Sequence, residues 1–207
     1  FGREGGRRRE IRISVRALVE FILRSGDIDN RKRTAPDNAM AEGGRIHRMI
    51  QRRMGADYQA EVTLRYVYET PSYDLVVEGR ADGVIHGDSA PQEAVTIDEI
   101  KGTYRDLEKM KEPVTVHLAQ AKCYAYMYAA GQNRERMKVR MTYCNMETEE
   151  LRYFTQEYSV RELEEWFFSL LEEYKKWADF GYEWQQIRTD SIRALVFPYA
   201  YREGQKE

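Results

Sequence analysis

The hydrophobic positions of this chain follow two periods, one helical and one extended. Apolar residues recur at three- and four-residue spacing in four segments, which predicts helices over 15–24, 38–54, 117–130 and 159–180. Aromatic and β-branched residues concentrate between them, which predicts strands over 60–69, 73–85, 94–101, 136–146 and 150–158. This order, a helix pair, a meander, a helix, a strand pair and a helix, indicates an α/β protein with a mixed β-sheet flanked by helices.

The 207 residues fit one globular domain that can bury a sizeable core. We expect residues 1–13 to be a flexible basic N-terminal segment, because they lack periodicity. The folded domain is predicted to span 14–194. Residues 195–207 leave the helical pattern at a Phe-Pro step and are predicted to form a linker.

Charge and cysteine content narrow the class of protein. Residues 1–58 hold 14 Lys and Arg against 8 Asp and Glu, a basic balance that suits a polyanion, although solvated charge on amphipathic helices is the commoner cause. No apolar run is long enough to span a bilayer. Only Cys123 and Cys144 occur, without metal-ligand spacing. We therefore expect a cytoplasmic protein without membrane contact, disulfides or structural zinc, whose cysteines are small core residues.

One predicted strand carries an acid and a base on a face that is otherwise apolar. In VTIDEIKG, alternation puts Val95, Ile97, Glu99 and Lys101 on one face, so a carboxylate and an ammonium emerge two positions apart. Asp98 lies on the other face and is interpreted as a bystander charge. A surface ladder of salt bridges is the alternative interpretation, since carboxylate-x-Lys is a weak pattern.

Pairing across the preceding hairpin adds a second carboxylate. A turn centred on the Ala-Pro step of HGDSAPQE makes the numbers of facing residues sum to 181. This register sets Asp82 opposite Glu99 and Arg80 opposite Lys101. Two carboxylates at the end of adjoining strands suit Mg²⁺, which prefers hard oxygen ligands.

Two helices carry further polar candidates. In HLAQAKCYAY, His117, Gln120 and Tyr124 form a polar stripe at i, i+3 and i+7 on an otherwise apolar helix. In EGGRIH, the paired glycines are expected to let the helix that carries His47 approach the sheet closely. Taken singly, such residues are more often hydrogen-bonded core or rim positions than ligands.

The segments EGGRIH, EGRADGVI, TIDEIKG and HLAQAKCYAY occur in this order. The series resembles the motifs of the RecB-like branch of the PD-(D/E)XK nuclease superfamily, over roughly residues 43–128. The resemblance implies a restriction-endonuclease-like fold and metal-dependent hydrolysis of phosphodiester bonds in DNA.

The resemblance also implies a metal site. It assigns Asp82, Glu99, His47 and the Ile100 carbonyl to one or two Mg²⁺ or Mn²⁺ ions. CRISPR-associated and AddB-type members of this branch hold an iron-sulfur cluster with four cysteines, whereas Cys123 has no companions here. We therefore expect no iron-sulfur cluster.

The remaining roles follow from the same resemblance. Asp82, Glu99 and Lys101 correspond to the catalytic residues, with Lys101 orienting the attacking water or stabilising charge on the phosphoryl oxygens. Gln120 and Tyr124 match a QxxxY helix that positions the strand. Three further residues are candidates for supporting these groups: Glu61, Arg80 and His117. Glu61 matches an acidic position that precedes the first strand in this branch.

The segment FPYAYREGQ, within 195–207, resembles the motif that opens the helicase core of XPD/DinG-like helicases. The resemblance implies that a helicase domain begins here and acts in cis with the nuclease. The expected function is therefore a DNA nuclease, working as an exonuclease on single strands. A catalytically inactive module that grips DNA for the helicase is the main alternative, and a structural spacer with an accidental polar stripe is another.

Overall fold

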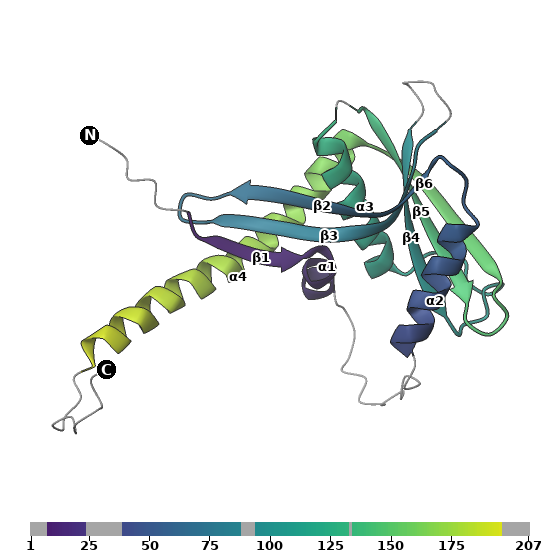
Figure 1. Ribbon diagram of the computed structural model, residues 1–207. Helices are drawn as coiled ribbons and strands as arrows, with labels where there is room; N and C mark the ends of the chain where they lie inside the picture. Colours follow the sequence, from purple (N-terminus) through teal and green to yellow (C-terminus); the bar gives the residue numbers. More distant parts are fainter. Residues whose placement is uncertain (1–7, 24–38, 88–93, 133, 196–207) are drawn as a thin grey trace.

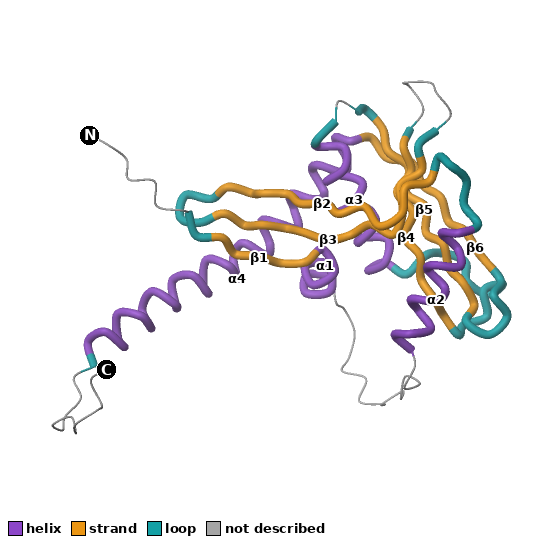
Figure 2. Tube along the Cα trace, in the orientation of Figure 1, coloured by secondary structure: helices purple, strands orange, loops and turns teal. Residues whose placement is uncertain are grey.

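The computed structural model describes residues 8–23, 39–87, 94–132 and 134–195. Its elements in chain order are β1 (Glu10–Ser14), α1 (Val15–Leu23), α2 (Ala39–Arg52), β2 (Tyr58–Glu69), β3 (Asp74–Ile85), β4 (Val95–Thr103), α3 (Thr115–Ala130), β5 (Arg136–Asn145), β6 (Leu151–Ser159) and α4 (Val160–Ala194). The strands form one six-stranded sheet with helices on its two faces (Figures 1 and 2). The predicted α/β fold class, a mixed β-sheet flanked by helices, is confirmed.

β3 organises the sheet, because three strands pair with it. β2 runs antiparallel along one edge of β3 over its whole length. The other edge is shared: β1 pairs with 74–78 in parallel, and β4 pairs with 83–85 in antiparallel. The sheet continues through β5, parallel to β4, and β6, antiparallel to β5. Among the described strands, none pairs with residues 79–82 on this second edge, so the sheet forks there.

The register predicted for the β3–β4 hairpin is confirmed where the two strands pair. The observed pairs, whose numbers sum to 181, are Gly83 with Asp98, Val84 with Ile97 and Ile85 with Thr96. Pairing ends at Gly83 and Asp98. Asp82 is therefore not paired with Glu99, and Arg80 is not paired with Lys101. This part of the prediction was wrong. The strands diverge because the Ile100 N–H donates to the Asp82 side chain, at 2.8 Å, rather than to a backbone carbonyl. Residues 88–93, which hold the expected turn, lie outside the described residues.

The sequence pattern did not predict β1. Residues 10–13, assigned from the sequence to the N-terminal segment, form most of this strand. Ile11 and Ile13 are partly buried against the core, while the residues that alternate with them are exposed. Ser14 then caps α1, its Oγ accepting from the Ala17 N–H at 3.1 Å, as its sequence position indicated.

Helices cover both faces of the sheet, and each face has its own core. The larger core joins α1, α3 and α4 to the strands, and it includes Cys123. On the opposite face, α2 packs Ile46 and Ile50 against Ile100 and Cys144. Both cysteines are fully buried, which confirms their interpretation as core residues.

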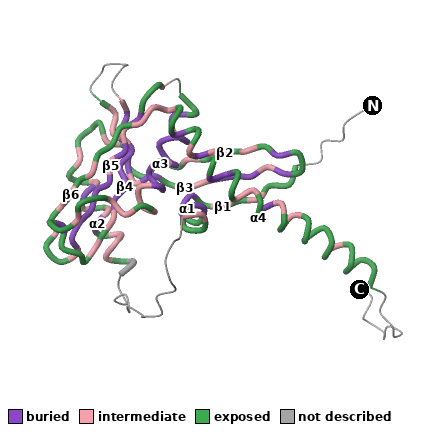
Figure 3. The backbone as a smooth tube through the Cα atoms, turned by 180° about the vertical axis from the view of Figure 1, so that it is seen from behind, coloured by how far each residue is buried: buried purple, intermediate pink, exposed green. Residues whose placement is uncertain are grey.

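The helix α4 begins with a capping box, in which Ser159 and Glu162 satisfy each other's backbone N–H groups. Its first half is anchored by buried apolar residues, among them Leu163, Phe167 and Leu171. Its second half projects beyond the sheet (Figures 1 and 3). The large apolar side chains exposed on that half are Trp177, Phe180, Trp184, Ile187 and Ile192. No helix among the described residues combines the length and the apolar character that crossing a membrane requires.

The two halves of α4 should therefore differ in their contribution to stability. Phe167→Ala should lower the free energy of unfolding by about 3–5 kcal/mol, because its fully buried ring leaves a cavity. Trp184→Ala removes a larger ring that is 59% exposed, so the expected change is within about 0.5 kcal/mol. Urea denaturation followed by circular dichroism measures both. Equal losses would contradict the difference in packing between Phe167 and Trp184 on this helix.

Candidate active site

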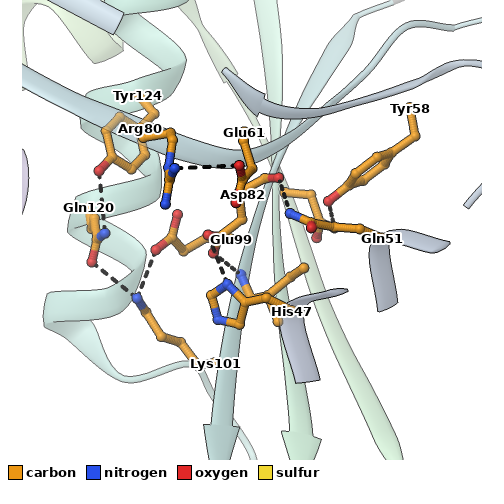
Figure 4. Close-up of polar contacts among 12 residues, drawn as sticks. His47, Gln51, Tyr58, Glu61, Arg80, Asp82, Glu99, Lys101, Gln120 and Tyr124 are labelled. Atoms are coloured by element: carbon orange, nitrogen blue, oxygen red, sulfur yellow. Dashed lines mark hydrogen bonds and ion pairs between the residues drawn. The ribbon is translucent and has the colours of Figure 1, made fainter. Parts of the chain in front are cut away.

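Asp82 lies in the fork of the sheet and is held from three directions (Figure 4). Its Oδ2 accepts from the Ile100 N–H at 2.8 Å, and its Oδ1 lies 3.1 Å from His47 Nδ1 on α2. Its backbone carbonyl accepts from the Gln51 side chain at 2.9 Å. His47 therefore faces the carboxylate, as predicted from its motif. Gln51 was not predicted, although it lies one helical turn after His47 on the same face.

A second chain of contacts runs from β4 to α3. The Lys101 ammonium donates to Glu99 Oε1 at 2.8 Å and to Gln120 Oε1 at 3.3 Å. The Gln120 amide donates in turn to the Tyr124 hydroxyl at 3.4 Å. Burial and the Glu99 carboxylate raise the pKa of Tyr124 to about 12, so this hydroxyl keeps its own proton available. The structure thus brings together the four predicted residues on this side.

Glu99 is fully buried and only half satisfied. Its Oε1 accepts from Lys101, whereas its Oε2 has no hydrogen-bond partner among the described residues. Burial, reinforced by the negative charge of Asp82, raises the pKa of Glu99 to about 8, while Lys101 acts in the opposite direction. A buried carboxylate oxygen without a partner is costly, and a cation at that oxygen would satisfy it.

The donor atoms fit a divalent cation held by carboxylates. Among the residues that the structure describes, no three His, Cys, Asp or Glu side chains are arranged as a ready metal-binding group. The Nδ1 of His47 is engaged with Asp82, so in this arrangement the imidazole orients that carboxylate. Asp82 and Glu99 supply hard oxygen donors, and the partnerless Oε2 of Glu99 is available to an ion. The roles of His47 and of the Ile100 carbonyl as ligands stay predictions.

The glycines of EGGRIH do not have the role that was predicted from the sequence. A Cβ atom on Gly43 would meet nothing within 4 Å, and one on Gly44 would meet only the guanidinium of Arg48. Close packing against the sheet is therefore not what requires them. The contact of α2 with the sheet is made by Ile46 and Ile50 instead.

Two other glycines are required by close approach. A Cβ atom on Gly79 would lie 2.7 Å from the hydroxyl of Tyr124, and one on Gly83 would lie 2.0 Å from the Tyr58 ring. Both belong to the segment EGRADGVI, on either side of Asp82. The spacing of this motif therefore leaves room for two tyrosines that pack against the strand carrying the carboxylate.

Glu61 lies within β2 and not before it, because this strand begins at Tyr58. Its φ of 56° is in the left-handed region, which costs a residue other than glycine about 1–2 kcal/mol. The β2–β3 ladder is interrupted here, so Glu61 and Asp82 face each other without pairing. Its side chain is exposed and forms an ion pair with Arg80 at 3.4 Å.

Asp98, interpreted from the sequence as a bystander, is the centre of a buried network on the opposite face of β4. It is fully buried and accepts twice from Arg140, at 2.9 Å each. It also accepts from Thr142 at 2.5 Å and from Tyr58 at 3.2 Å. This network fastens β4 to β5 and β2 behind Glu99. The bystander interpretation was wrong, because alternation reveals the face of a residue but not what covers it.

His117, the first residue of the predicted polar stripe, lies beside the Lys101 chain and not within it. Its Nδ1 is 3.1 Å from the hydroxyl of Tyr143, and its ring lines a hollow that begins at Gly102. No polar pattern pointed to Tyr143, which belongs to the apolar pattern of β5.

Comparison with known proteins adds a distant similarity of fold. No protein-family model and no curated protein sequence matches the chain. Solved structures of similar fold include SSO0001, at 16% identity over 80% of this chain and 79% of that chain with a TM-score of 0.49. They also include an alkaline exonuclease, LHK-Exo from Laribacter hongkongensis, at 14% identity over 89% of this chain and 95% of that chain with a TM-score of 0.46. Similarity at this level does not transfer residue roles.

The Asp98 network should be essential to stability. Arg140→Ala leaves a buried carboxylate without its cation, and the expected loss is about 3–5 kcal/mol. Arg161 forms an ion pair with Glu165 at 3.0 Å on the exposed surface of α4, so Arg161→Ala should cost at most about 1 kcal/mol. Thermal and urea unfolding of both variants measure the difference. A loss no greater for Arg140→Ala than for Arg161→Ala would show that this network does not hold β4 in place.

Proposed function

We propose that this domain is a metal-dependent nuclease that hydrolyses phosphodiester bonds in DNA. The observation that carries the proposal is the partnerless, buried oxygen of Glu99 in a site that also contains Asp82 and the Lys101 ammonium. Two carboxylates without enough cationic partners attract a divalent ion, and of the two Asp82, in the fork of the sheet, is partly exposed.

Asp82 and Glu99 would hold Mg²⁺ or Mn²⁺, with His47 and the Ile100 carbonyl as further candidate ligands. Such an ion, when bound, polarises the scissile phosphate and lowers the pKa of an attacking water. The His47 ring and the Ile100 N–H fix the orientation of the Asp82 carboxylate.

The remaining residues act on the substrate directly or, in the case of Gln120, through Lys101. Lys101 carries a positive charge at the site and stabilises negative charge that develops on the phosphoryl oxygens. Gln120 holds the Lys101 ammonium in place. The Tyr124 hydroxyl, which accepts from Gln120, donates its proton to an oxygen of the strand and positions it.

We infer a single strand of DNA as the substrate and removal of nucleotides from its end as the mode of action. The main alternative, a catalytically inactive module that grips DNA, is disfavoured because Asp82, Glu99 and Lys101 are all present. A helicase domain in cis stays a prediction, since the segment FPYAYREGQ that suggests it lies outside the described residues.

Removal of any of the three central charges should abolish cleavage. Asp82→Ala, Glu99→Ala and Lys101→Ala are each expected to reduce the rate at least about 100-fold, because each removes a group that acts on the reacting phosphate. The assay follows end-labelled linear single strands and circular single strands with Mn²⁺. Chelation by EDTA should stop digestion, and circles should survive if the enzyme needs an end.

Two matched controls accompany this assay. Asp190→Ala and Lys176→Ala remove a carboxylate and an ammonium that are exposed on α4, where each pairs with a residue of the same helix, and should retain the parent rate. Parent-like cleavage by Lys101→Ala would contradict the assignment. DNA binding by a parent protein that never cleaves would favour the inactive module.

Binding of the cation should be measurable without any reaction. Mn²⁺ at about 100 times its Kd should stabilise the parent by about 2.7 kcal/mol, because only the folded state brings the carboxylates together. Asp82→Asn and Glu99→Gln should each remove this metal-dependent rise in Tm, whereas Asp190→Asn should keep it. Differential scanning fluorimetry with and without Mn²⁺ is the measurement. An undiminished rise in Glu99→Gln would mean that its partnerless oxygen is not a ligand.

A further inference from the structure

A hollow beside the site has no part in the proposed reaction. The connector between β4 and α3 borders an open hollow of about 680 Å³, and the lining includes Arg105, Lys109, Met110, Lys111, Pro113 and Val114. An adjoining hollow of about 280 Å³ shares Arg105, Met110 and Val114 with it, and reaches His117 and Gly102. Gly102 directly follows Lys101, so this space opens where the catalytic strand ends.

The wall of the hollow carries uncompensated positive charge. Lys109 is neutralised by Asp106, at 2.9 Å. Arg105 and Lys111 have no acidic partner among the described residues, and Glu112 contributes a single carboxylate without a cation to the same wall. Two unpaired cations on a mostly exposed connector, next to an apolar surface, suit a ligand with both a phosphate and an apolar part.

His117 offers a hydrogen-bond donor between the catalytic lysine and this wall. Burial, together with the positive charges of Lys101, Arg16 and Arg105, lowers the pKa of His117 to about 4, so its ring is neutral near pH 7. The Tyr143 hydroxyl accepts from the Val114 N–H at 3.0 Å. When that hydroxyl donates its single proton to Nδ1 of His117, at 3.1 Å, the neutral ring carries its own proton on Nε2 and can donate it.

We propose that this hollow binds the nucleotide next to the scissile phosphate. Arg105 and Lys111 contact its phosphate, the Nε2–H of His117 donates to an oxygen of the same backbone, and Met110 and Val114 cover its sugar and base. A base that enters the hollow cannot stay paired, so the ligand is a single strand. The inference rests on the proposed function, because it takes the strand to run from the Asp82 and Glu99 site past Lys101.

The test measures binding without hydrolysis. A fluorescent oligothymidylate is titrated with the protein in EDTA at several salt concentrations, and anisotropy gives Kd. Arg105→Ala/Lys111→Ala should weaken binding about tenfold or more and lower the slope of log K against log salt by about 0.7, the contribution of one neutralised phosphate on a single strand. Arg188→Ala/Arg193→Ala, which removes two cations from the far end of α4, should stay within about twofold of the parent.

Two variants of His117 separate binding from packing. His117→Gln keeps a donor near the Nε2 position and should retain most of the affinity, whereas His117→Leu fills the space without a donor and should lose it about fivefold. Circular dichroism and Tm confirm that both variants are folded. Equal affinities for the Gln and Leu variants would remove His117 from the site.

The outcomes distinguish this inference from the proposed function. Parent-like Kd and salt slope in Arg105→Ala/Lys111→Ala would overturn the inference even if the domain cleaves DNA. An equal loss on a blunt duplex would also overturn it, because it would indicate general attraction and no pocket for an unpaired nucleotide. Selective loss on single strands would support the inference even in a domain that never cleaves.

Discussion

The sharing of one edge of β3 between two strands is the constraint on which the rest of this structure depends. β1 uses the first part of that edge and β4 the last, and residues 79–82 are left between them. Backbone groups released from a ladder need other partners. Gln51 takes the carbonyl of Asp82, and the Asp82 side chain takes the N–H of Ile100. The gap in the sheet therefore both exposes the carboxylate and fixes its orientation.

Asp98 and Glu99, which are adjacent on β4, differ in how many of their carboxylate oxygens have hydrogen-bond partners. Asp98 and Glu99 are both buried, on opposite faces of the same strand. Asp98 accepts from Arg140, Thr142 and Tyr58, so both its oxygens are satisfied. Glu99 accepts only from Lys101 and keeps one oxygen without a partner. The network on the other face of the strand holds it to its neighbours in spite of this deficit.

Much of the fold could be predicted from the sequence, because its helices and long strands have strong periodic patterns. Alternation placed Glu99 and Lys101 on one face, and the symmetry of the hairpin gave the correct register as far as Gly83. The end of pairing could not be predicted, since it depends on a side chain replacing a backbone partner. β1 was missed because two isoleucines among arginines form a strand only when β3 is beside them.

The candidate residues of the site were predictable as a set, but their supports were not. Gly79 and Gly83 are needed because Tyr124 and Tyr58, from distant segments, occupy the space of their missing side chains. Asp98 could be recognised as structural only once Arg140 of β5 was known to lie beside it. Such information depends on tertiary contacts, which a local pattern does not contain.

The polar stripe of α3 connects the chemistry at the fork to the hollow beyond it. Seven residues separate His117 from Tyr124, which corresponds to about 10 Å along a helix. Tyr124 packs against β3 at Gly79, Gln120 holds Lys101 at the centre, and His117 lines the hollow. In the proposed complex, one helix therefore sets the spacing between Lys101 at the fork and His117 at the hollow. Because this helix is buried among α1, α4 and the sheet, that spacing is fixed by the core, whereas the cations of the hollow lie on the connector that precedes the helix.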